Sequence, residues 1–252
     1  MNAKPRVGLF VTCLVDLMRP SVGFAAVQLL QQAGCDVFVP ETQTCCGQPA
    51  WNSGADKDAA AIARQVIDAF ESFDYVVVPS GSCSGMITRH YTEALRDDPV
   101  YAPRAKALAA KTHELTSFLV DVRGMKALAA TCAMRACYHD SCSSLREMKV
   151  KSQPRALLAS VAALTLSELK GPEVCCGFGG LFSVKYPDIS ERMADDKIAD
   201  VQSTGAELLI GGDLGCLLHL AGRMERQGKP VRVRHVAEVL ANMANGPALG
   251  EP

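Results

Sequence analysis

Eight cysteines form two sets of four with nearly the same spacing. Each set contains a single cysteine, an adjacent pair 32 or 33 residues later, and one further cysteine. The first set is Cys13, Cys45, Cys46 and Cys83, and the second set is Cys142, Cys175, Cys176 and Cys216. A glycine follows each adjacent pair, and two copies of Cys-Cys-Gly exceed what this composition gives by chance. The chain therefore contains one unit twice.

The spacing within each set favours an iron–sulfur cluster over a single metal ion. Structural zinc sites usually take thiolates from C-x-x-C pairs, and this sequence has none. Adjacent cysteines with single distant partners suit different iron atoms of a cluster held by four thiolates. Gly47 and Gly177 allow backbone turns that bring amide N–H groups close to sulfur. We expect iron–sulfur clusters, of the [4Fe-4S] type, with zinc as the alternative.

The other cysteines and a histidine motif give weaker signals. Cys35, Cys132 and Cys137 have no counterpart in the repeat, so we expect them to be buried in the core. The run 139–142, His-Asp-Ser-Cys, would suit a nucleophilic thiol with a histidine base. However, adjacent residues of a strand point to opposite faces, and the first half has Val-Thr at the matching place. A thiol-dependent redox enzyme remains an alternative function.

Short apolar runs alternate with longer amphipathic segments, which is typical of β-α-β units and a parallel sheet. The sequence therefore predicts an α/β fold of two homologous halves with mainly parallel sheets. Expected strands cover 7–11, 36–39, 75–78, 136–139, 164–166 and 208–210. Every cysteine segment follows one of these strands, and open parallel sheets bind ligands at the carboxyl ends of their strands. Eight thiols should therefore gather at these edges.

The same pattern predicts helices and a boundary between the halves. Ser21 should cap a helix that carries Phe24 and ends at Gly34, and another helix should span 57–72. We place a first cysteine-rich domain at 1–125 and a second at 126–252, joined through the segment 124–130. A weaker repeat aligns His113 with His235. The last residues, 245–252, are predicted to fray.

Charge and hydropathy exclude several classes of protein. The formal net charge is −1, which argues against a surface that binds nucleic acid or anchors to a membrane. No apolar run approaches the roughly 18 residues of a transmembrane helix, and the apolar start of the chain is too short for a signal peptide. Without export, cysteines stay reduced and serve as ligands or buried residues. We expect a soluble, cytoplasmic protein.

The cysteine motifs resemble a known group of domains. They are similar to the cysteine-rich domains of the iron–sulfur subunits of heterodisulfide reductase, glycolate oxidase and anaerobic glycerol-3-phosphate dehydrogenase. The whole chain most resembles the lactate utilization protein A family. The matching stretches are 9–16, 45–50, 79–83, 139–142, 175–180, 215–217 and 235–240.

The resemblance implies a subunit of a multi-subunit L-lactate dehydrogenase that converts lactate to pyruvate. It implies iron–sulfur ligation by the eight cysteines, a ferredoxin-like iron–sulfur partner and a third subunit. No residue here resembles a base that would take a proton from lactate during hydride or proton abstraction. We therefore expect an electron-transfer subunit whose catalytic site is shared or lies on a partner; a zinc-binding or metal-free structural subunit is the alternative.

The chain departs from the wider family at two positions. The last motif of that family is C-x-x-C, and here the first position is Ser80 in one half and Asp213 in the other. Each half keeps four thiols, which favours an ordinary four-iron cluster over an enlarged one. An oxygen ligand from either residue would match a thiolate site poorly.

Overall fold

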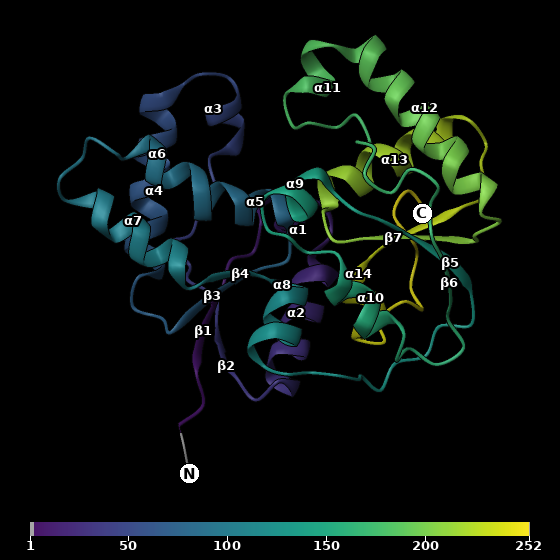
Figure 1. Cartoon of the computed structure of the whole chain (residues 1–252), viewed down its shortest axis with the longest axis horizontal. Coiled ribbons are helices and arrows are strands. Elements are labelled where there is room, and N and C mark those ends of the chain that lie inside the picture. Colours follow the sequence, from purple (N-terminus) through teal and green to yellow (C-terminus); the bar gives the residue numbers. More distant parts are fainter. Residues whose placement is uncertain (1–2, 252) are drawn as a thin grey trace.

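Residues 3–251 are described by the computed structural model. Within them, two four-stranded sheets have the same order, β2-β1-β3-β4 and β6-β5-β7-β8, and every strand pairing is parallel (Figure 1). The strands are β1 (Arg6–Leu9), β2 (Asp36–Phe38), β3 (Tyr75–Val78), β4 (Thr112–Glu114), β5 (Arg135–His139), β6 (Thr165–Ser167), β7 (Leu208–Gly211) and β8 (Arg232–His235). The predicted α/β fold of two homologous halves is confirmed.

Helices connect the strands in both halves. In the first half they are α1 (Cys13–Met18), α2 (Pro20–Gln32), α3 (Gln48–Asn52), α4 (Asp56–Phe70), α5 (Gly81–Gly85), the π-helix η1 (Met86–His90), α6 (Tyr91–Ala94), α7 (Tyr101–Ala110), α8 (Leu115–Ser117) and the π-helix η2 (Phe118–Val122). In the second half they are α9 (Cys142–Arg146), α10 (Ser152–Leu158), α11 (Phe182–Lys185), α12 (Pro187–Ser203), α13 (Leu214–Arg226) and α14 (Val236–Leu240). None of the helices in 3–251 is long and apolar enough to span a membrane.

The first strand and the first long helix differ from expectation in their boundaries. β1 ends at Leu9 because the Val11 N–H donates to the Gln43 side chain and Thr12 caps α1. α2 begins at Pro20, so Ser21 is not its cap; the Ser21 hydroxyl donates to Glu238 in the other half instead. A local capping pattern therefore concealed a contact between the halves.

The two halves pack in a nearly symmetric way. The helix that begins with each first cysteine packs on the helix that carries the last cysteine of the other half: α1 on α13, and α9 on α5. Likewise α2 packs on α14, and α10 packs on α8 (Figure 1). The same two helix contacts therefore occur once in each direction between the halves, as expected when two copies of a duplicated unit pack against each other.

A single apolar cluster runs through both halves. It contains Val7 and Leu29 from the first half and Leu209 and Leu240 from the second. The segment 124–130 carries no helix or strand. The domain boundary between 125 and 126 stays a prediction, since one shared core joins the two halves.

The end of the chain is packed, so the predicted fraying is wrong for 245–251; residue 252 lies outside the described residues. Ala248 and Leu249 are buried, and the Leu249 N–H donates to the Val233 carbonyl. The Pro247 carbonyl accepts from the Arg19 guanidinium at 2.7 Å. The residues that hold the tail are distant from it in sequence, so the local sequence pattern does not predict these contacts.

The alignment of His113 with His235 is also wrong by one residue. Glu114 pairs with Val78 at the end of β4 and caps α8, whereas His235 pairs with Gly211 at the end of β8 and caps α14. Glu114 is therefore the counterpart of His235. The His235 ring also lies 3.2 Å from the Pro79 carbonyl in the first half.

We predict that Gly81→Ala destabilises the chain by at least about 2 kcal/mol, because overpacking between rigid elements costs that much. A Cβ on Gly81 would lie 2.7 Å from the backbone N and Cα of Ser144, where α5 meets α9. Urea unfolding checks the free energy. Gly222→Ala on α13 is the control: its Cβ would meet only the Arg226 side chain at 3.6 Å, so it should be neutral or stabilising. Equal effects of the two changes would contradict this packing.

Candidate metal centres at the two cysteine clusters

The four cysteines of the first set lie together. Cys13 is the first residue of α1, Cys83 lies in α5, and Cys45 and Cys46 occupy the loop before α3. The Sγ atoms of Cys13 and Cys45 are 3.8 Å apart, and those of Cys46 and Cys83 are 3.3 Å apart. The Gly47 N–H donates to the Cys45 sulfur at 3.5 Å. We call this group the first quartet.

The second set forms an equivalent group, the second quartet. Cys142 begins α9 and Cys216 lies in the first turn of α13. The Cys176 and Cys216 sulfurs lie within 4.8 Å of each other, and Cys142 and Cys175 are close enough to shift each other's pKa. Backbone N–H groups of the two residues after the pair donate to the Cys175 and Cys176 sulfurs at 3.4 and 3.5 Å. The structure thus brings together all eight cysteines that the repeat singled out.

Local sequence explains why each thiol faces its quartet. The side chains of Thr12, Ser80 and Ser141 accept from backbone N–H groups at the starts of α1, α5 and α9. Each cap fixes the first helical turn, which holds a quartet cysteine. Gly177 has a φ of +91°, and a Cβ there would lie 2.5 Å from the Ser190 carbonyl. Only glycine lets the Cys-Cys loop turn this closely against α12.

Each quartet lines a cavity of its own. All four cysteines of the second quartet line a cavity of about 200 Å³, and all four of the first line one of about 210 Å³. The two cavities share five lining residues, namely Gln48, Ser82, Phe178, Gly180 and Asp213. The two quartets are therefore neighbours.

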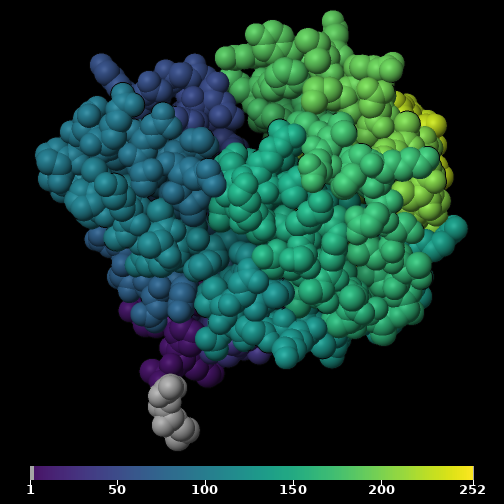
Figure 2. All heavy atoms as spheres, viewed as in Figure 1, coloured from purple at the N-terminus to yellow at the C-terminus, as the bar shows by residue number. Residues whose placement is uncertain are grey.

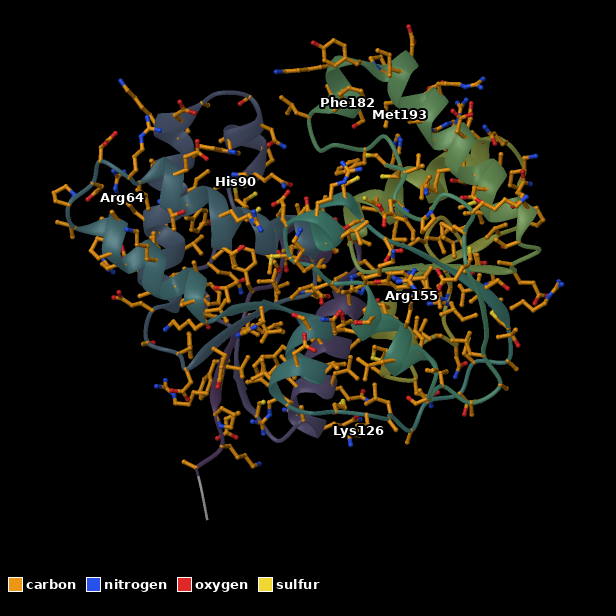
Figure 3. All side chains as sticks on the ribbon, viewed as in Figure 1. Arg64, His90, Lys126, Arg155, Phe182 and Met193 are labelled. Atoms are coloured by element: carbon orange, nitrogen blue, oxygen red, sulfur yellow. The ribbon has the colours of Figure 1, made fainter. Side chains whose placement is uncertain are left out.

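The second cavity opens between the two lobes of the molecule. Figure 2 shows a hollow between the part of the first half that contains α3 and the part of the second half that contains α11. His90 and Phe182, labelled in Figure 3, belong to these opposite lobes. His90 and Asn52 line the second cavity from the first half. Both halves thus enclose the second quartet.

One thiol of each quartet is poised to be a thiolate. The Cys13 thiol donates to the Cys45 sulfur and lowers the pKa of Cys45, and the neighbouring Cys46 and the Gly47 N–H act in the same direction. The pKa of Cys13 is raised, because its hydrogen bond to Cys45 holds its proton. The pKa of Cys175 is lowered by the same arrangement in the second quartet. Thiolates bind metals, so these two sulfurs are ready ligands.

Ser80 and Asp213, which stand where the wider family has cysteine, make hydrogen bonds to α5. Asp213 lies in the second half, yet its carboxylate accepts from the Ser82 N–H at 2.9 Å and lies 3.4 Å from the Ser80 hydroxyl. Ser80 in turn accepts from the Cys83 N–H at 3.3 Å. Both residues therefore join the halves beside the two quartets.

The residues around Cys142 do not form a nucleophile with a base. The neighbouring Cys175 raises the pKa of Cys142, so the Cys142 thiol is not activated. Asp140 is held by both terminal nitrogens of Arg155, at 2.7 and 2.9 Å, so it does not orient a histidine. His139 is buried, and burial lowers its pKa to about 3, with the nearby Lys197 acting in the same direction.

His139 is the residue near the quartets that the sequence analysis did not single out as a ligand. One of its ring nitrogens and the Cys176 and Cys216 sulfurs all lie within 4.8 Å of one another. A signal was present: His139 precedes Cys142 by three residues and Phe10 precedes Cys13 by three, so the match of His-Asp to Val-Thr in the sequence was wrong by one residue. The repeat identifies residues that the two halves have in common, and His139 is not one of them because the first half has Phe10 at this position.

The remaining cysteines are buried as expected. Cys35, Cys132 and Cys137 all belong to the shared apolar cluster. Burial raises the pKa of each thiol. They are inert core residues, and they supply matched controls for the quartets.

The donor set of each quartet fits a thiolate-bound metal centre. Four sulfurs line one cavity, and backbone N–H groups approach the sulfurs of the adjacent pairs. Such N–H groups support thiolate ligands and tune the centre they hold. The ligand role of the eight cysteines stays a prediction.

We predict a pH-dependent contribution from Glu114, which is buried between the halves. Burial raises its pKa from 4.5 to about 7, and the Asp213 carboxylate adds to this. As pH rises from 4.5 to 7, the unfolded chain ionises Glu114 before the folded chain does, so folding loses stability. The wild type should therefore lose about 3 kcal/mol over this window relative to Glu114→Gln.

Unfolding free energies of both proteins at several pH values check this prediction. The difference between them cancels contributions of other titrating groups, including the buried histidines. Parallel pH profiles of the two proteins would contradict a raised pKa at Glu114.

Comparison with known proteins identifies the repeated unit. A family model described as a cysteine-rich domain matches the chain twice, over residues 7–88 and 136–221. Each match contains all four cysteines of one quartet.

Relatives match almost the whole chain. Lactate utilization protein A of Bacillus subtilis is 50% identical over 93% of this chain and 98% of its own length. The protein of the same name from Geobacillus kaustophilus is 51% identical with the same coverage.

A solved structure shares the fold. The crystal structure of a hypothetical protein from Helicobacter pylori has a TM-score of 0.69 and 11% identity. It covers 97% of this chain, and the chain spans about half the length of that protein. Two matches to the cysteine-rich domain model and about 50% identity over nearly the full length place this chain in the lactate utilization protein A family.

Proposed function

We propose that this chain is an iron–sulfur electron-transfer subunit of a complex that oxidises L-lactate to pyruvate. Cys13, Cys45, Cys46 and Cys83 would hold one four-iron cluster, and Cys142, Cys175, Cys176 and Cys216 would hold a second. Lactate enters the proposal through the relatives, which are named for lactate utilization.

The observation that carries this proposal is that each quartet lines one cavity of about 200 Å³. A water molecule occupies roughly 30 Å³ of liquid, so each cavity is several waters in size. A single ion bound by four thiolates needs no such space beside it. The volume therefore favours a larger inorganic core over one ion.

The position of the cavities suits a relay of single electrons. Oxidation of lactate to pyruvate releases two electrons and two protons, and an iron–sulfur cluster accepts one electron at a time. Phe178 and Asp213 line both cavities and so form part of the wall between them. Two neighbouring clusters in one chain could each take one of the two electrons.

The residues of this chain would control the clusters rather than the substrate. Leu14, Leu181 and Leu214 line the first cavity and would shield a cluster held there from water. The N–H groups that point at the Cys45 and Cys175 sulfurs would lower the charge on the thiolates and so raise the reduction potential.

Neither cavity offers the permanently charged side chain that usually binds a carboxylate substrate. Among the described residues that line the two cavities, none is lysine or arginine. We therefore place lactate on a partner subunit or on a site shared with one. The partners would be a ferredoxin-like iron–sulfur subunit and a third subunit, in the cytoplasm, where thiols stay reduced.

One observation favours zinc as a second candidate. The Cys13 and Cys45 sulfurs are 3.8 Å apart. Two thiolates on one tetrahedral zinc ion, with Zn–S bonds of about 2.3 Å, lie roughly that far apart. A zinc-bound chain would be a structural subunit and would carry no electrons.

We predict that Cys46→Ala removes about half of the iron and sulfide from protein reconstituted anaerobically, because it breaks one quartet and leaves the other intact. Cys176→Ala should remove the other half. Iron and sulfide analysis with electron paramagnetic resonance (EPR) of the reduced protein measures the loss. Cys35→Ala, a buried cysteine outside both quartets, is the control and should keep the full complement.

Three results would overturn the proposal. Cys46→Ala protein with full iron and sulfide would show that the first quartet is not a ligand set. Wild-type protein that binds zinc but no iron under anaerobic conditions would favour the structural candidate. Iron-free protein that oxidises substrate and is inactivated by alkylation of a single thiol would favour a thiol-dependent enzyme.

A further inference from the structure

His139 lies in the second half with its imidazole buried and unpartnered. It is the last residue of β5, where it pairs with Gly211, and its exposed fraction is 1%. Neither ring nitrogen has a hydrogen-bond partner among residues 3–251. Buried polar groups without partners cost free energy, so native proteins seldom keep one that has no function.

The ring faces the second quartet. One ring nitrogen lies within 4.8 Å of both the Cys176 and Cys216 sulfurs, and these two sulfurs are equally close to each other. Imidazole nitrogen and thiolate sulfur bound to one metal ion, at about 2.0 and 2.3 Å, fall within this separation. The three donor atoms are therefore close enough to one another to belong to one metal centre.

The first half provides an internal comparison. Phe10 lies three residues before Cys13, as His139 lies three residues before Cys142. The Phe10 N–H donates to Val77 beside the end of β1, and its ring packs on Phe70 at 5.5 Å between centroids. The same place beside each quartet therefore holds hydrocarbon in one half and imidazole in the other.

The surroundings of His139 leave it no other evident role. Asp140 is engaged by Arg155. The nearby buried Lys197 donates to the Gly171 carbonyl at 2.6 Å. Neither neighbour uses the ring nitrogens of His139, and a neutral imidazole binds metal through such a nitrogen.

We propose that His139 is a nitrogen ligand of the second metal centre. The second centre then has four thiolates and one imidazole, whereas the first has thiolates only. The identity of the metal as cluster iron rests on the proposed function. A neutral imidazole at this position gives an iron–sulfur centre a higher reduction potential than a thiolate there would.

Pulsed EPR of the reduced, anaerobically reconstituted full chain tests this ligand. Protein labelled with ¹⁵N-histidine is compared with unlabelled protein, so that any histidine nitrogen bound to a paramagnetic centre is recognised. We expect a histidine coupling in the wild type and its loss in His139→Phe, which copies the first half. His113→Phe is the control and should keep the coupling, since His113 only stacks between Tyr75 and Phe118.

A second variant separates ligation from packing. His139→Cys restores a ligand but not a nitrogen, so it should lack the histidine coupling, retain the iron that the wild type holds, and lower one of the two midpoint potentials. It also covers the case in which His139→Phe fails to fold, which circular dichroism would reveal. A histidine coupling that survives in either variant would overturn the proposal, as would its absence from iron-loaded wild type.

Failure of the proposed function would look different. If the wild type takes up no iron and sulfide, the same variants are titrated with cobalt(II), whose absorption spectrum reports its ligands. A shift in the spectrum of one bound cobalt in His139→Phe would support nitrogen ligation at a single-ion centre. Identical cobalt spectra in wild type and variant would overturn it.

Discussion

The structure depends on the close approach of the two halves at the helices that carry the cysteines. α1 packs on α13 and α9 packs on α5, so the first cysteine helix of each half is fixed by the last cysteine helix of the other. At the α5–α9 contact only a glycine fits, because Ser144 occupies the space of a Gly81 side chain. This approach gives the two cavities a common wall. The packing of these helices between the halves thus fixes the positions of the sulfurs and also brings the two quartets close together.

Duplication supplies two similar sites, and single substitutions make them unequal. Asp213 accepts from the Ser82 N–H of α5 in the other half, whereas its counterpart Ser80 caps its own helix. His139 stands beside the second quartet where Phe10 stands beside the first. The second cavity is lined by Glu147 and His90, and the first by leucines. Two metal centres held in these surroundings would differ in potential, which would give the proposed electron flow a direction.

Much of this arrangement could be predicted from the sequence, because repetition and periodicity are local signals. The Cys-Cys-Gly repeats indicate the duplication, and the alternation of strands and helices indicates which sheet edge carries the thiols. Contacts between distant segments carry no such signal. Ser21 resembles a helix cap and instead binds Glu238, and the end of the chain resembles a frayed tail yet packs through Leu249. His139 could not be recognised as a ligand from the sequence, because only the folded chain shows that its ring is unpartnered and lies near Cys176 and Cys216.

The central claim is that each quartet holds an inorganic cluster rather than a single ion. X-ray absorption spectroscopy of the anaerobically purified chain, at the iron and zinc edges, tests it most directly. The account predicts iron surrounded by sulfur with a second shell of iron neighbours, and that second shell arises only where metal atoms share bridging sulfide. Zinc or iron bound by sulfur with no metal neighbour would contradict it.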